Sequence, residues 1–129
     1  MFLIDTSVWI HLLGKNKKYK ITEEQLLSVV LCPPIVQEIF QGIRDDFTHK
    51  KIMENLMALP QVGTPVLLQD YLKASEIYRI GRQKGYTIRS SVDCLIAAIA
   101  IREDVPIWHE DRDFDRISKF TELKTAGPM

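Results

Sequence analysis

The residues of this chain that invite a chemical interpretation are acidic, and they stand beside apolar stretches. Asp5 follows the opening run FLI, and Glu38 lies within PPIVQEIFQGI. Asp93 stands in SSVDCLIAAIAIR, and Asp111 and Asp113 follow VPIW as a D-x-D pair. Carboxylate oxygens are hard ligands, and no histidine or cysteine is spaced to join them. The set therefore favours Mg²⁺ or Mn²⁺ over zinc.

Carboxylates gathered at one place repel one another, and a divalent cation offsets that repulsion. A magnesium ion held by carboxylates, with coordination positions left for water, is typical of phosphoryl-transfer sites. The metal lowers the pKa of an attacking water and stabilises charge that develops on the phosphate. If the acids converge, they indicate metal-dependent chemistry at a phosphate ester.

Two of the acids have ordinary structural explanations as well. Thr6 or Ser7 can cap the helix that follows the first apolar run, which leaves Asp5 one position too early for a cap. Asp5 therefore suits a turn as well as a site. Glu38 falls at the border of a helix with an apolar core face, where a solvated glutamate is common. Neither residue decides the function alone.

Asp93 is the most informative acid. Its helix is apolar nearly all round, and a helical wheel places Asp93 on the same side as Ile96, Ala97 and Ala100. The amides of the first turn, with Ser90 or Ser91 as cap, explain its position along the helix but not its side. A buried charge requires a partner or a metal. Asp93 is therefore expected to be functional.

Short apolar stretches alternate with helical patterns along the chain. We expect strands over residues 2–4, 28–32, 66–68 and 105–108, a capping box over residues 22–25, and helices over residues 8–13, 33–43, 49–59, 70–84 and 91–102. This alternation predicts an α/β fold, three-layer α/β/α, with a mostly parallel central sheet. Ligand sites in such sheets lie at the carboxyl ends of the strands, where Asp5 and Asp111 stand.

The charge balance directs attention to local basic groups. Lysine and arginine number 17, as do aspartate and glutamate, so the net charge is zero and any contact with phosphates has to be local. The candidate contacts form two groups, for which a solvated surface is the alternative: Lys15, Lys17, Lys18 and Lys20, and Arg79, Arg82, Lys84 and Arg89.

The remaining composition points to a single cytoplasmic domain over residues 1–129. No apolar run approaches the roughly 20 residues that span a bilayer, and the first residues do not resemble a signal peptide. Cys32 and Cys94 lie far apart among apolar neighbours, so they are expected to be buried free thiols. We therefore expect no membrane association.

Four motifs, in this order and spacing, resemble the PIN-domain ribonucleases and, within them, VapC-like toxins of toxin–antitoxin pairs: LIDTSVWI, IVQEIFQGI, RSSVDCLIAAIAI and VPIWHEDRDFDRI. The resemblance covers essentially the whole chain and implies a PIN-like fold. It implies that an acidic quartet binds metal, with Asp5 and Asp93 as the principal magnesium ligands and Glu38 and Asp111 completing the set. Thr6 or Ser7 would orient a water or ligand near the metal.

The last motif departs from the family pattern. Many relatives carry Thr-x-Asn or Thr-Asn before the Asp-Phe pair, whereas this chain has His109, Glu110 and Asp111. Asp111 and Asp113 are therefore rivals for the fourth position and both are catalytic candidates. Asp111 ranks first because it lies closer to the strand end. His109, in place of the hydroxyl residue, is expected to pack or form hydrogen bonds rather than position water.

The resemblance also implies an activity and partners. These are endonucleolytic cleavage of RNA by a metal-activated water, with 3′-hydroxyl and 5′-phosphate products, a homodimer, and inhibition by a small VapB-like antitoxin. A catalytically silent PIN-like module for RNA binding or interaction is the main alternative, although it predicts loss of the acids. A relative that cuts DNA with the same acids is a further alternative. A receiver domain is disfavoured because only one acid follows the first strand.

Overall fold

The computed structural model describes residues 1–15 and 18–126. Within them, four short strands form one sheet: β1 (Phe2–Ile4), β2 (Val29–Val30), β3 (Ile107–Trp108) and β4 (Thr125–Ala126). The strand order is β2-β1-β3-β4, and every neighbouring pair is parallel. The predicted α/β class with a parallel sheet is therefore confirmed.

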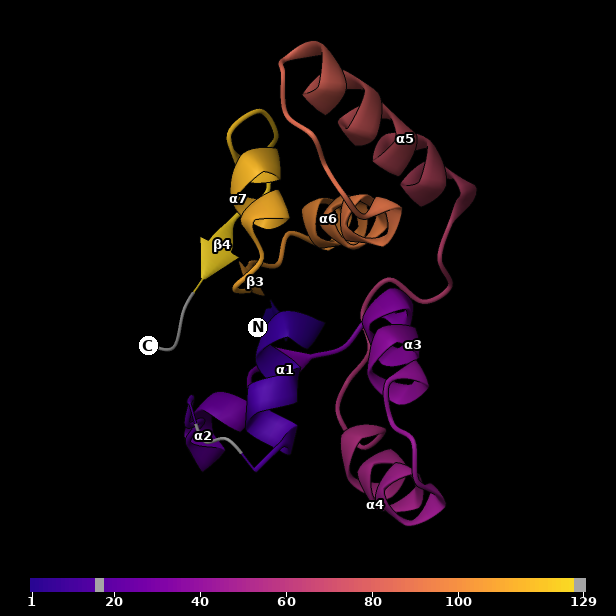
Figure 1. Ribbon diagram of the computed structural model, residues 1–129, viewed down its shortest axis with the longest axis vertical. Helices are drawn as coiled ribbons and strands as arrows, with labels where there is room; N and C mark the ends of the chain where they lie inside the picture. The colour runs from indigo at the N-terminus through magenta and orange to yellow at the C-terminus, as the bar shows by residue number, and fades with distance from the viewer. Residues whose placement is uncertain (16–17, 127–129) are drawn as a thin grey trace.

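Helices cover the sheet on two sides. They are α1 (Thr6–Leu13), α2 (Glu23–Leu26), α3 (Pro33–Gln41), α4 (Asp46–Leu56), α5 (Leu68–Gln83), α6 (Ser91–Glu103) and α7 (Arg112–Ser118). Figure 1 shows α5, α6 and α7 above the strands and α1, α2 and α4 below them. This arrangement is the expected three-layer architecture.

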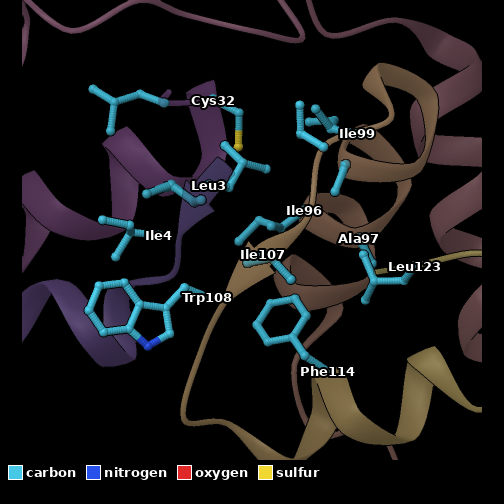
Figure 2. Close-up of a cluster of buried hydrophobic side chains, with 14 of the residues drawn as sticks. Leu3, Ile4, Cys32, Ile96, Ala97, Ile99, Ile107, Trp108, Phe114 and Leu123 are labelled. Carbon is cyan, nitrogen blue, oxygen red and sulfur yellow. The ribbon is translucent and has the colours of Figure 1, made fainter. Parts of the chain in front are cut away.

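The core lies between the sheet and its helices. Leu3 pairs in register with Val30 on one side and with Ile107 on the other. These residues are fully buried, as expected for a parallel sheet that is covered on both faces. Figure 2 shows Leu3, Ile107 and Ile96 of α6 in one apolar cluster. The short strands thus gain their stability from packing as well as from pairing.

Helix α6 passes through the interior, as its apolar sequence predicts. Five consecutive residues from Ile96 to Ala100 are buried, and α5 packs along it. Ser90 caps α6, because its Oγ accepts a hydrogen bond of 3.3 Å from the backbone N–H of Asp93. Cap and packing together fix Asp93 in the first turn, on the side that faces the protein interior.

Several local expectations need correction. The predicted strand over residues 66–68 is wrong, because Leu68 already begins α5 and the Asp70 carboxylate accepts from the backbone N–H of Leu67 at 2.9 Å. β4 was missed, since two residues of sequence Thr-Ala carry no strand pattern. Helix α4 begins earlier than predicted because Asp45 caps it, accepting from the Thr48 N–H at 2.8 Å.

Other local expectations are confirmed. The capping box at the start of α2 is present, with both the Thr22 and Gln25 side chains bonded to the backbone. The thiols of Cys32 and Cys94 are free and buried. Among the described residues, no helix combines the length and apolar character that crossing a membrane requires.

Candidate functional site

Five predicted acids come together at the carboxyl ends of β1 and β3. One oxygen from each of Asp5, Glu38 and Asp93 lies within 4.8 Å of the other two, and the same holds for Asp93, Asp111 and Asp113. Asp93 belongs to both groups. The acids come from different elements. Asp5 and Asp111 follow the strands β1 and β3, and Glu38 lies in the middle of α3. Asp93 and Asp113 lie in the first turns of α6 and α7.

The backbone brings the first and last of these elements together. The Asp5 N–H donates a hydrogen bond of 2.9 Å to the carbonyl oxygen of Trp108, the last residue of β3. Because β1 and β3 are adjacent and parallel, the residues that follow them emerge at the same edge of the sheet. Parallel pairing is therefore what places Asp5 beside Asp111.

Asp5 is both the cap of α1 and a member of the acidic cluster. Its Oδ2 accepts hydrogen bonds from the Ser7 backbone N–H at 3.1 Å and from Ser7 Oγ at 2.6 Å. The expectation that Thr6 or Ser7 would cap this helix is therefore wrong. Only one carboxylate oxygen serves the cap, and the side chain is 4% exposed. No hydrogen bond reaches its Oδ1 from the residues that the structure describes.

Asp93 is the electrostatic centre of the cluster. It is 4% exposed, and its Oδ2 has no hydrogen-bond partner within the described part of the chain. Burial, followed by the charges of Asp5, Asp111 and Glu38, raises the pKa of Asp93 to about 8. A buried carboxylate in this situation gains from a proton or from a cation.

Glu38 turns toward the cluster rather than toward solvent. The Thr6 hydroxyl donates a hydrogen bond of 3.2 Å to its Oε1. Burial and then the charge of Asp5 raise the pKa of Glu38, and the Thr6 hydrogen bond opposes that shift. The structure thus gives Thr6 and Ser7 different carboxylate partners.

The structure distinguishes Asp111 from Asp113. Asp113 is 1% exposed, and each of its oxygens is engaged: Oδ2 accepts from the Arg89 N–H and Oδ1 from Arg116 Nη1, both at 3.0 Å. Asp111 caps α7 through one oxygen, which accepts from the Asp113 N–H at 2.9 Å. Asp111 also contributes to the raised pKa values of Asp93 and Glu38. It is therefore the more available of the two acids.

The donor set suits a hard divalent cation. All donors in the cluster are carboxylate oxygens, which Mg²⁺ and Mn²⁺ prefer. The nearby thiols offer no alternative, because burial raises the pKa of Cys32 to about 12 and that of Cys94 to about 11. The buried Oδ2 of Asp93, which has no hydrogen-bond partner among the described residues, suits a cation ligand.

The profile of the PIN domain family matches residues 2–120. This chain belongs to the PIN-domain family. It is 37% identical to the VapC ribonuclease Mb1587 of Mycobacterium bovis and to the ribonuclease VapC11 of Mycobacterium tuberculosis, over 98% of this chain and 98% of each relative. The resemblance that the sequence motifs suggested is thereby confirmed.

Solved structures agree on the fold. VapBC2 from Rickettsia felis, crystallised with a DNA fragment from its promoter, contains a chain that matches with a TM-score of 0.78. That match covers 98% of this chain and 97% of the other at 18% identity. A VapBC-5 chain from Mycobacterium tuberculosis gives a TM-score of 0.68 at 16% identity, with the same coverage of both chains. At these identities the likeness concerns the fold alone.

One residue that the motifs left without a role connects the loop after β3 with α1 and with residues 18 and 19. Glu110 accepts hydrogen bonds from Lys18 at 2.5 Å and from Tyr19, and it lies 3.1 Å from His11 Nε2. The bond from Lys18, followed by that from Tyr19, lowers the pKa of Glu110 to about 2. A glutamate in an acid-rich loop carries no sequence signal for this role, because its partners lie about 90 residues away along the chain.

The two basic groups predicted as phosphate contacts differ in the structure. Arg89 lies near the cluster, with Nη2 3.8 Å from Asp111 Oδ1. Lys18 is instead paired with Glu110, and Lys17 lies outside the described residues. His109 packs against the ring of Phe114 with its side chain 7% exposed, in agreement with the expected packing role.

Proposed function

We propose that this chain, as a single PIN domain over residues 1–129, is a magnesium-dependent endoribonuclease and the toxin of a toxin–antitoxin pair. The observation that carries the proposal is the carboxylate cluster built around Asp93, whose buried Oδ2 lacks a partner among the described residues. The 37% identity to two VapC ribonucleases supports RNA as the substrate. Mn²⁺ suits the same ligands.

Each acid has a distinct role in this proposal. Asp5, Glu38, Asp93 and Asp111 would hold the cation, and its positive charge would favour the ionised form of Asp93. A bound Mg²⁺ would lower the pKa of a water molecule and neutralise charge developing on the phosphate. Asp113 serves catalysis by positioning, because it holds the Arg89 backbone and the Arg116 guanidinium beside the cluster.

Three further features extend the proposal: a VapB-like antitoxin as partner, a homodimer, and a cytoplasmic location. The relatedness to VapC ribonucleases supports the antitoxin. A groove of about 490 Å³ between α1, α2 and α4 also supports a protein partner, because most of its lining is apolar. Its apolar lining residues are Trp9, Leu12, Leu13, Leu26, Phe47, Ile52, Leu56 and Leu59.

The decisive experiment incubates the purified protein with labelled RNA and DNA of matched sequence, with MgCl₂ or with EDTA. We expect the wild-type protein to cleave the RNA with MgCl₂ and not with EDTA. The variants Asp5→Asn and Asp93→Asn should lose this cleavage. Asp46→Asn, which changes an exposed acid in the first turn of α4, is the matched control and should cleave normally. Cleavage that persists in EDTA or in both cluster variants would show that the cation-dependent assignment is wrong.

The toxin role has its own test. Induced expression of the wild-type chain should arrest bacterial growth, whereas Asp93→Asn should not. Co-expression of the antitoxin encoded beside it should restore growth. Equal growth of cells that express the wild type and Asp93→Asn, at equal protein levels, would contradict the toxin role while leaving the nuclease assignment to the cleavage assay.

A further inference from the structure

Beside the acidic cluster lies a cavity with three arginines in its wall. Its volume is about 310 Å³, and its lining residues are Gly85, Tyr86, Thr87, Arg89, Arg112 and Arg116. We call it the arginine cavity. None of the described residues that line it is acidic. Guanidinium groups pair well with phosphate oxygens, so this lining suits a phosphate ligand.

The three arginines are compensated to different extents. Arg116 is paired with the buried Asp113 through Nη1 at 3.0 Å. Arg89 is 69% exposed and only approaches Asp111 and Asp113, at 3.8 Å and 4.0 Å. The Arg112 side chain is exposed and makes no hydrogen bond or ion pair with any described residue. Part of the positive charge that lines the cavity is therefore not compensated by carboxylates. A cation bound to Asp111 would leave more of the Arg89 charge uncompensated.

The arginine cavity is adjacent to the proposed cation site. Arg89 connects the two, because it lines the cavity while its Nη2 lies 3.8 Å from Asp111 Oδ1. Arg89 also lines a second groove between α5 and α6, of about 710 Å³, together with Tyr78, Arg79 and Arg82. A continuous arginine-rich surface therefore leads away from one side of the cluster.

The other candidate surface, the lysine group near residue 18, is less suited to phosphates. The ammonium group of Lys18 is held by Glu110, so its charge is already compensated. A phosphate there would have to compete with a carboxylate that also accepts hydrogen bonds from Tyr19 and contacts His11. Charge complementarity thus favours the arginine side as the path of a polyanion.

We propose that the arginine cavity binds a backbone phosphate of single-stranded RNA that flanks the phosphodiester held at the carboxylate cluster. Arg112 and Arg89 supply the contacts, and Arg116, held by Asp113, forms the fixed wall. The proposal deepens the nuclease function and rests on it. It also assigns a direction: the strand leaves the cluster over α7 and α5 rather than over the lysine group.

The test measures binding without cleavage. Fluorescence anisotropy gives the Kd of a labelled single-stranded oligoribonucleotide in EDTA, at NaCl from about 50 to 200 mM. Arg112→Gln is the principal variant, because this exposed side chain supports no other described residue. Arg89→Gln is the second. Lys50→Gln removes one charge from exposed α4 and is the control, and a Lys15→Gln/Lys20→Gln double variant tests the rival surface.

We expect Arg112→Gln and Arg89→Gln each to weaken binding about 3- to 10-fold at the lower salt and to reduce the slope of log K against log salt by about 0.7. Arg112→Lys should keep part of the affinity, because it retains the charge but not the planar fork. Lys50→Gln and the lysine double variant should bind like wild type. Single-stranded DNA of the same sequence should show the same arginine dependence, since the contacted group is the phosphate.

Wild-type affinity and slope in both arginine variants would overturn the inference. So would a reduced slope in the lysine double variant alone. Failure of the nuclease proposal can be distinguished from failure of this inference. If the protein binds RNA through Arg112 but does not cleave it in MgCl₂, the arginine cavity is a binding site and the nuclease proposal is wrong. A protein that cleaves RNA while Arg112→Gln has an unchanged Kd and KM loses only the inference about the cavity.

Discussion

Ser7 Oγ donates a hydrogen bond of 2.6 Å to Oδ2 of Asp5. The same hydroxyl oxygen accepts a hydrogen bond of 3.1 Å from the Glu110 backbone N–H. Ser7 therefore connects the acid after β1 to the loop after β3. With Oδ2 held by the cap and by Ser7, Oδ1 is the oxygen that Asp5 offers to a cation. A residue that touches no substrate thus fixes the orientation of a proposed ligand.

Ser7→Ala should weaken Mg²⁺ binding about 10-fold, because a hydrogen-bonding partner that orients a metal ligand typically contributes that much. The measurement is the Mg²⁺ dependence of RNA cleavage, together with calorimetric titration of Mg²⁺. Ser7→Thr retains the hydroxyl and should restore most of the affinity. If Ser7→Ala binds Mg²⁺ like wild type, the hydroxyl only connects Asp5 to the loop after β3.

Asp93→Asn should stabilise the protein in the absence of divalent cations. The pKa of Asp93 is raised from 3.8 to about 8, so the folded chain holds its proton more tightly than the unfolded chain. The contribution of Asp93 to the stability of the metal-free wild type is therefore largest below pH 4. It falls as the pH rises toward about 8. The neutral amide avoids that loss.

The gain expected for Asp93→Asn in EDTA at pH 8 is about 1–3 kcal/mol, shrinking toward zero near pH 4. Urea unfolding at several pH values measures it. With MgCl₂ the order should reverse, because the cation stabilises only the chain that binds it. A variant that is less stable than wild type in EDTA at pH 8 would mean that Asp93 is satisfied in a way this geometry does not contain.

Asp111→Asn and Asp113→Asn should separate binding from stability. Asparagine caps helices as well as aspartate does, so Asp111→Asn should keep its stability and lose Mg²⁺ affinity. Asp113→Asn removes the charge that holds Arg116 and presents an amide to the Arg89 N–H, at a cost of about 3 kcal/mol. Thermal unfolding and Mg²⁺ titration of both variants check this. The opposite pattern would make Asp113 the fourth ligand.

Two glycines with positive φ should respond differently to alanine. A Cβ at Gly63 (φ 69°) would lie 2.4 Å from Ile99 Cγ2, in the buried part of α6. Gly63→Ala should therefore cost more than about 2 kcal/mol, through both strain and a core clash. Gly85 (φ 84°) has nothing within 4 Å, so Gly85→Ala should cost about 1 kcal/mol from backbone strain alone. Equal losses in urea unfolding would contradict the clash at Ile99.

The expectations from sequence succeeded where a residue's pattern reflects one dominant physical requirement. The apolar run before Asp5 and the nearly uniform apolar helix around Asp93 have few alternatives to burial, so their elements were predicted well. They failed where a neighbour in space decides. Residues 66–68 look like a strand, yet α5 begins at Leu68, and Arg102 of α6 holds the carboxylate of Asp70 in its first turn. The strand β4 exists only because Thr125 and Ala126 pair with β3.

The sequence by itself determined the alternating α/β order, the acids and the hard-ligand chemistry, because periodicity and residue type are properties of the chain. Only the tertiary structure decided how those acids differ. Asp5 caps α1 and faces the cluster, and Asp111 keeps one oxygen available for a ligand. Both oxygens of Asp113 accept hydrogen bonds from arginines. Such distinctions depend on which donor lies within about 3 Å of which carboxylate oxygen. The parallel pairing of β1 with β3 brings these groups together, although the two strands are about 100 residues apart in the chain.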